Sequence, residues 1–138
     1  MKLTLSVTIV ALLSGGCATF SPLPLEARHI RRVGESSARV YVWKPVLKFQ
    51  SGTFIVRGAV QKRVCGESTL GTRLQVVLYD AAGNKLRENW LDFSPAELPS
   101  QQGRRPRTGS YVETLGPLPP GTTRIEVRAR DADHPPGG

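Results

Sequence analysis

A strict alternation of apolar and polar residues runs through much of this chain and limits the folds it can adopt. In TRIEVRARD, near the C-terminus, Ile125, Val127 and Ala129 alternate with arginine and glutamate side chains. Successive residues of a strand point to opposite faces, so the pattern predicts strands with one buried and one solvent-facing side. Beyond the first 16 residues, no stretch of eleven or more residues has the 3.6-residue period of an amphipathic helix. The other residues expected on buried faces are Val40, Val42, Phe54, Val56, Val60, Leu74, Val76 and Leu78.

Strand-like segments of this kind number about seven, at intervals of about 10 to 15 residues. We therefore predict an all-β fold, an antiparallel β-sandwich over residues 36–132, followed by a disordered tail at residues 133–138. An immunoglobulin-like arrangement is the first choice, a transthyretin-like sandwich is the alternative and a closed barrel comes third, because the sequence does not determine strand order. TRLQVVLYD and KLRENWLDF, joined by AAGN, are expected to form a hairpin. Gly58 indicates a bulge or the close approach of another backbone.

An uncharged apolar segment near the N-terminus, Leu3–Leu13, leads through three small residues to Cys17. It is about half as long as the roughly 20 residues a helix needs to cross a bilayer, and it has the length of a secretory signal. LSGGC resembles the bacterial lipobox, in which the cysteine thiol receives a diacylglycerol; a plain signal peptide is the alternative. The resemblance implies a lipoprotein signal peptide at residues 1–16, lipidation of Cys17, and a lipidated N-terminus and tether at residues 17–35. Ala18 stands where an aspartate would retain a lipoprotein in the inner membrane, which implies an outer-membrane anchor facing the periplasm.

Basic residues outnumber acidic ones by 19 to 11, and most of them are arginines. Arginine binds phosphates and carboxylates bidentately, so the charge suits lipid A or phospholipid head groups, although a GC-rich genome gives the same bias. We do not expect a nucleic-acid partner. The segment SPAELPSQQGRRPRTGS, Ser94 to Ser110, has almost no apolar pattern and is predicted to be a long loop. Its Arg104, Arg105 and Arg107 are the candidate anion-binding residues; a solvated charge run is the simpler explanation.

Cys65 is a candidate free thiol. With Cys17 lipidated it has no partner in the chain for a disulfide, so it is either buried and inert or exposed for intermolecular pairing. The spacing of Cys65 and His29 suggests neither a nucleophile–base pair nor a metal site. We therefore expect no catalytic residues, no metal and no cofactor. Trp43 and Trp90 are out of phase with the core residues, or near strand ends, and form a second candidate contact surface or the edge of the core.

Leu78-Tyr79-Asp80 and the following Gly83 resemble the signature region of FxLYD-type domains, which are small immunoglobulin-like modules of prokaryotic exported proteins and lipoproteins. The upstream FIVRGAV and the downstream LGPLPPGTTRIEVRA are similar to strands of that family, so the resemblance covers roughly residues 38–130. It implies an immunoglobulin-like fold and no catalytic residues.

These features together predict a non-enzymatic, membrane-anchored envelope lipoprotein that acts as a binding or assembly module for an envelope protein. One alternative is a binder of anionic envelope ligands, such as lipopolysaccharide, through the arginine-rich loop. Another is a small metal carrier or enzyme that uses Cys65.

Overall fold

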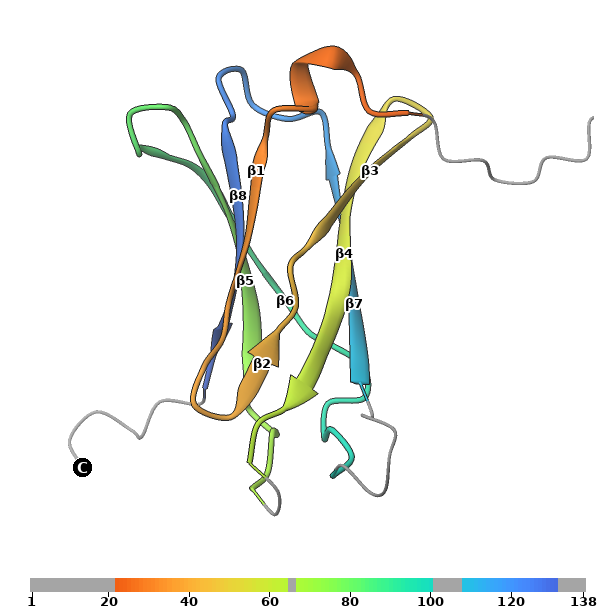
Figure 1. The fold of residues 1–138 in the computed structure, drawn as a ribbon, viewed down its shortest axis with the longest axis vertical. Helices are drawn as coiled ribbons and strands as arrows, with labels where there is room; N and C mark the ends of the chain where they lie inside the picture. The colour runs from red at the N-terminus through yellow and green to blue at the C-terminus, as the bar shows by residue number, and fades with distance from the viewer. Residues whose placement is uncertain (1–21, 65–66, 101–107, 132–138) are drawn as a thin grey trace, which may run out of the picture.

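The computed structural model describes residues 22–64, 67–100 and 108–131, and these residues form a two-layer β-sandwich (Figure 1). Its elements are one short 3₁₀ helix, η1 (Leu25–Ala27), and the strands β1 (Arg31–Glu35), β2 (Val40–Val42), β3 (Val46–Gln50), β4 (Thr53–Lys62), β5 (Arg73–Tyr79), β6 (Lys85–Leu91), β7 (Thr108–Gly116) and β8 (Arg124–Arg130). One sheet has the order β1-β8-β5-β6. In the other, β2 and β3 pair with one side of β4, and β7 pairs with its other side. The predicted all-β sandwich, mostly antiparallel, is confirmed.

The strand pairing follows part of the immunoglobulin-like scheme. That scheme places strands A, B, E and D in one sheet and C, F and G in the other, and among the described residues no strand takes the place of D. β2 and β3 together take the place of A, β4 pairs with β7 as B does with E, and β5 pairs with β8 as C does with F. A C-terminal strand would normally lie beside F. Here β1 fills that position from the N-terminal side and runs parallel to β8.

The core lies between the two sheets. The residues that the alternation placed on buried faces are all buried in it except Phe54, which is half-buried and packs against the core cluster. Val56 and Val60 from one sheet meet Val76, Leu78 and Ile125 from the other, and all five side chains are fully buried. The β5–β6 hairpin is also confirmed, with Leu74 opposite Leu91 and Val77 opposite Glu88.

The outer face of β5 is covered, although its alternation predicts an exposed side. Val77 is fully buried, and Tyr79 is only 8% exposed. Arg124 and Arg128 of the neighbouring β8 lie 4.3 and 5.7 Å from the centroid of the Tyr79 ring. Arg128 also donates a hydrogen bond to the Tyr79 hydroxyl at 2.7 Å and pairs with Glu126. Long arginine side chains therefore shield apolar surface on this face while their charged ends bind polar partners.

The sandwich begins earlier in the chain than the alternation indicated. Residues 31–35, which were assigned to the tether, form β1 and pair with residues 124–128. Just before them, Ala27 and Ile30 are buried in the core cluster. RRVGE has little alternation of its own, because β1 is an edge strand with all its side chains exposed or half-buried.

The segment from Ser94 to Ser110 was predicted to be a long loop. Among its described residues, 95–100 contain no helix or strand, as expected, whereas 108–110 belong to β7. Ser94 and Ser110 exchange two backbone hydrogen bonds, of 2.9 and 3.0 Å. Leu98 is 1% exposed and belongs to the core cluster. Its amide donates to Thr69 Oγ1 at 2.8 Å, and the Glu97 carboxylate accepts from the amide of Thr69 at 3.1 Å. A single apolar residue in a polar segment therefore fixes the segment to the core.

Gly58 lies in an unbulged part of β4. The irregularity in this strand falls between Phe54 and Ile55 instead. A Cβ at Gly58 would lie 2.5 Å from the Tyr111 hydroxyl oxygen and 2.8 Å from Cζ of the same ring. The close approach predicted at Gly58 is therefore made by an aromatic side chain and not by a backbone.

Candidate functional site

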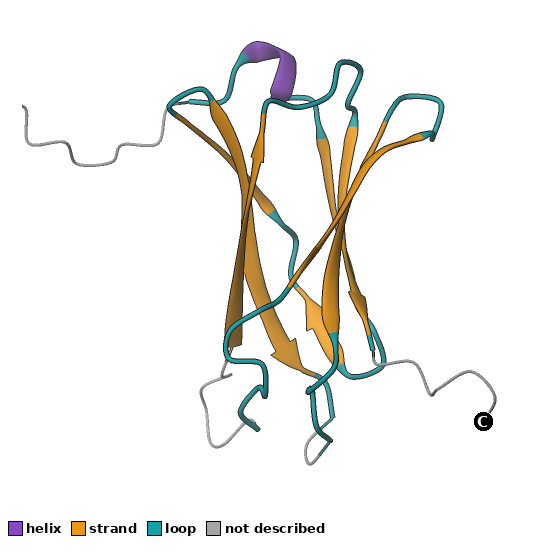
Figure 2. Cartoon of the chain, turned by 180° about the vertical axis from the view of Figure 1, so that it is seen from behind, coloured by secondary structure: helices purple, strands orange, loops and turns teal. Residues whose placement is uncertain are grey.

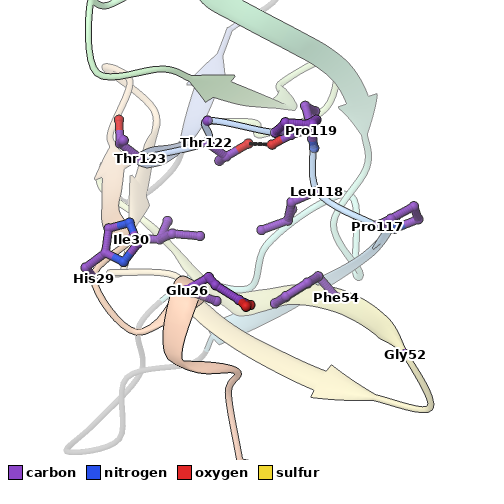
Figure 3. A pocket seen from close by; sticks show the side chains of 13 residues that line it. Glu26, His29, Ile30, Gly52, Phe54, Pro117, Leu118, Pro119, Thr122 and Thr123 are labelled. Atoms are coloured by element: carbon purple, nitrogen blue, oxygen red, sulfur yellow. Dashed lines mark hydrogen bonds between the residues drawn. The ribbon is translucent and has the colours of Figure 1, made fainter.

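An apolar pocket lies at one end of the sandwich. At this end η1 crosses between the two sheets (Figures 1 and 2). We call this the η1 end. The cavity has a volume of about 480 Å³. Three separate segments line it: the chain around η1, the β3–β4 hairpin, and the β7–β8 connection (Figure 3). The lining residues are Glu26, Ala27, His29, Ile30, Gly52, Phe54, Pro117, Leu118, Pro119, Pro120, Gly121, Thr122 and Thr123.

The η1 segment is held against the sandwich by local hydrogen bonds and by two buried side chains. The amide of Ala27 donates to the carbonyl of Pro24 at 2.9 Å, and that of Ile30 donates to Ala27 at 3.2 Å. Ala27 and Ile30 are 4% and 6% exposed, so this turn presents its apolar side to the core. Glu26 and His29 fall between these contacts, and both are exposed at the rim.

The β7–β8 connection forms a stiff wall because it contains three prolines. The Pro119 carbonyl accepts a hydrogen bond from the amide of Thr122 at 3.3 Å and another from its hydroxyl at 2.7 Å (Figure 3). This turn has proline at its second position and Gly121, with φ +85°, at its third, which are the residues a type II turn requires. The amide of Thr123 donates to the Tyr79 carbonyl at 2.9 Å and ties the connection to β5. Proline has a fixed φ and no backbone donor, so the wall is both rigid and apolar.

The pocket could accommodate an apolar group, and its lining has few ionisable side chains. Phe54 and Leu118 are only partly buried and contact the core cluster from the pocket side. Among the described residues that line the cavity, Glu26 and His29 alone are ionisable. Across all described residues, no three His, Cys, Asp or Glu side chains gather as a metal site. No helix in these ranges is long and apolar enough to cross a membrane.

Most of the site residues predicted from the sequence lie outside the described ranges. These are Cys17, Cys65, Arg104, Arg105 and Arg107.

Three other residues named in the sequence analysis can be placed. His29 lines the rim of the pocket. Trp43 and Trp90 are 45% and 47% exposed, on the outer faces of different sheets.

The pocket itself was not predicted from the sequence. Its one local signal is GPLPPG, which reads as a turn, and nothing in that motif indicates that η1 and the β3–β4 hairpin meet it. Three segments far apart along the chain must be assembled before the cavity exists.

No family model, curated protein or solved structure matches this chain. The resemblances to the lipobox and to FxLYD-type domains therefore stay predictions, and the geometry of the pocket is what bears on function.

Proposed function

We propose that this chain is a non-enzymatic lipoprotein, anchored through Cys17 to the outer membrane and facing the periplasm, whose sandwich binds an apolar segment of an envelope partner protein. The observation that carries the proposal is the pocket at the η1 end. It is a concave, mostly apolar cavity with a volume of about 480 Å³ and with two ionisable side chains at its rim. Sites that bind ligands commonly combine a mostly apolar, preformed wall with a few polar groups that orient the ligand.

The distance along the chain between anchor and pocket supports this assignment. Glu26 is the first residue to line the pocket, and it follows Cys17 by nine residues. Nine residues of extended chain span at most about 30 Å. A lipid on Cys17 would therefore hold the pocket close to the membrane surface, within reach of partners assembled there.

Anchoring is tested by labelling cells with radioactive palmitate. We expect label in the wild-type protein and fractionation with the outer membrane, with both lost in Cys17→Ser. Unlabelled wild-type protein, or unchanged fractionation of the variant, would remove the anchor from the proposal.

Binding in the pocket is tested by photo-crosslinking in cells. A crosslinking amino acid at His29 should give a defined adduct with one envelope protein, whereas the same group at Leu70, in the β4–β5 connection, should not. Leu118→Ser should weaken the adduct, because Leu118 lines the cavity, and Leu70→Ser is the matched control.

The arginine-loop alternative predicts the opposite pattern. Replacing Arg104, Arg105 and Arg107 with alanine would then abolish retention of the protein on lipid A or phospholipid, and Leu118→Ser would not. Our proposal requires the triple variant to form the crosslinked adduct as the wild type does.

A further inference from the structure

The outer face of the sheet formed by β2, β3, β4 and β7 is unusually apolar for a solvent-facing surface. Tyr41, Trp43, Val46 and Val112 are 47, 45, 37 and 61% exposed. Strand register brings them onto one surface: Val46 lies opposite Arg57, and Arg57 lies opposite Val112. Contiguous exposed apolar residues on a folded domain generally mark a contact surface. We call these four residues, together with the half-buried Ile55, the aromatic face.

The two aromatic residues of this face form a pair suited to a boundary between water and lipid. Tyr41 and Trp43 are two residues apart on one strand face, and their rings meet edge to face with centroids 5.7 Å apart. Tyrosine and tryptophan each combine a large apolar ring with a polar atom, and both are enriched where membrane meets water.

The charge on this surface is entirely basic among the described residues. Lys48 and Arg57 alternate with the core residues of β3 and β4 and so point outward, and the exposed Lys44 lies between β2 and β3. The four strands contain one acidic residue, Glu113, which is opposite the buried Val56 and so faces away from this surface.

The outer face of the other sheet has a different character, because it carries acidic as well as basic side chains. Arg128 pairs with Glu126 and with Glu35, and Arg124 also pairs with Glu126. Of the two outer faces, as formed by the described residues, the aromatic face therefore combines exposed apolar area with basic side chains and no acidic ones.

We propose that the aromatic face docks onto the surface of an anionic phospholipid bilayer, with Tyr41 and Trp43 at the head-group level. Basic residues beside a membrane gain about 1 kcal/mol each from anionic lipid, and aromatic side chains supply the apolar contact. A second copy of the chain is a poorer occupant, because two such faces brought together would oppose basic residues without any acid between them. The pocket places Glu26 near Gly52 at the β3–β4 turn, so the N-terminal segment joins the domain at the end of this same sheet.

The test uses the full-length protein with one tryptophan at a time. Trp90→Phe leaves Trp43 on the proposed docking face, and Trp43→Phe leaves Trp90 on the opposite face as the control. Each protein is added to vesicles of brominated phosphatidylcholine mixed with phosphatidylglycerol, or of brominated phosphatidylcholine alone. Bromine quenches only tryptophan that lies at or below the head groups. We expect Trp43 to be quenched several-fold more than Trp90 in the anionic vesicles, and raised salt to reduce the difference.

A pair of substitutions that adds negative charge tests the electrostatic part of the proposal and leaves both tryptophans unchanged. Ser110 and Thr114 are exposed, and they lie opposite Ala59 and Ile55 on the outward side of β7. Changing both to glutamate should at least halve the quenching of Trp43. The matched control, Ala81→Glu with Ala82→Glu in the β5–β6 turn, adds the same charge elsewhere and should leave the quenching unchanged.

Three outcomes would overturn the proposal. One is equal quenching of the two tryptophans, and another is quenching of Trp43 that does not depend on anionic lipid. The third is a stable dimer in solution in which Trp43 is already shielded, which would make the face an interface between copies. The result is separable from the lipid anchor: a protein that floats with vesicles while neither tryptophan is quenched keeps the anchor and loses the docking. Quenching of Trp43 in a protein without palmitate would keep the docking and remove the anchor.

Discussion

Replacing Gly58 with alanine should destabilise the sandwich through a single contact. The added Cβ would meet the Tyr111 ring at 2.5 Å from its hydroxyl oxygen, 2.8 Å from Cζ and 3.0 Å from Cε1. The ring cannot move aside easily, because Tyr111 is 2% exposed and belongs to the core cluster. Burial is also what raises the pKa of this tyrosine well above its usual range.

Two opposing effects determine the size of the change. Alanine in a strand interior is favoured over glycine by about 0.5 to 1 kcal/mol because less backbone entropy is lost on folding. Forcing an extra methyl into a packed core costs about 1 to 3 kcal/mol. The overlap with Tyr111 involves its hydroxyl oxygen and two ring carbons, all at 3.0 Å or less, so we expect the second effect to dominate. The net loss should be about 1 to 2 kcal/mol, which lowers the urea midpoint by about 0.5 to 1 M for a domain of this size.

The assay is equilibrium unfolding in urea, followed by tryptophan fluorescence, on Gly58→Ala, Tyr111→Phe and the double variant. Among the described residues, the Tyr111 hydroxyl has no hydrogen-bond partner, so Tyr111→Phe alone should be neutral or stabilising. In the double variant the shortest contact disappears while the contact with Cζ remains. Phenylalanine should therefore recover about 0.5 to 1 kcal/mol of the loss. An alanine variant as stable as wild type, or additive effects in the double variant, would show that the ring does not lie over Gly58.

Three further predictions concern the stability of other regions and are read from urea midpoints. Leu98→Ala should cost about 2 to 5 kcal/mol, because the side chain is 1% exposed; Leu70→Ala, at a 58% exposed position, should stay within about 0.5 kcal/mol. The pKa of Glu97 is lowered, first by the hydrogen bond from the Ser68 hydroxyl. Its carboxylate therefore stabilises the fold above the pKa that Glu97 has in the unfolded chain, and this stabilisation is lost on acidification. Glu97→Gln should therefore be less stable than wild type at neutral pH, and the difference should vanish as pH falls through the folded-state pKa; a constant difference would refute it. Gly83→Ala should cost about 1 to 2 kcal/mol from its φ of +85° alone, since a Cβ there meets nothing within 4 Å.

The parts of the fold that could be predicted from sequence are those governed by local pattern. The segment around Ile125 alternates strictly because β8 has one face in the core, so its inward residues were identifiable. The β5–β6 hairpin was identifiable for a similar reason: Asp80 accepts hydrogen bonds from the amides of Ala82 and Asn84, which favours a turn at that point.

The remaining features depend on residues far apart in sequence. β1 is a strand because it lies beside residues 124–128, and no pattern within RRVGE contains that information. Leu98 packs in a core made of residues from other strands, and its amide binds Thr69, so its burial also depends on residues far away in sequence. Val77 lies on the outer face of β5, where alternation predicts contact with solvent, but side chains of neighbouring strands cover it. The pocket belongs to the same class, since it requires three segments to converge.

The parallel pairing of β1 with β8 has a mechanical consequence. The described chain enters β1 from the η1 end and leaves β8 at the opposite end (Figure 1). A pull on the two chain ends would therefore slide these strands past each other and load the bonds along residues 31–35 together, instead of peeling them apart singly. A domain pulled through the chain ends of β1 and β8 should accordingly unfold in one step at high force. Force spectroscopy would show this as a single tall peak, and a gradual low-force extension would contradict it.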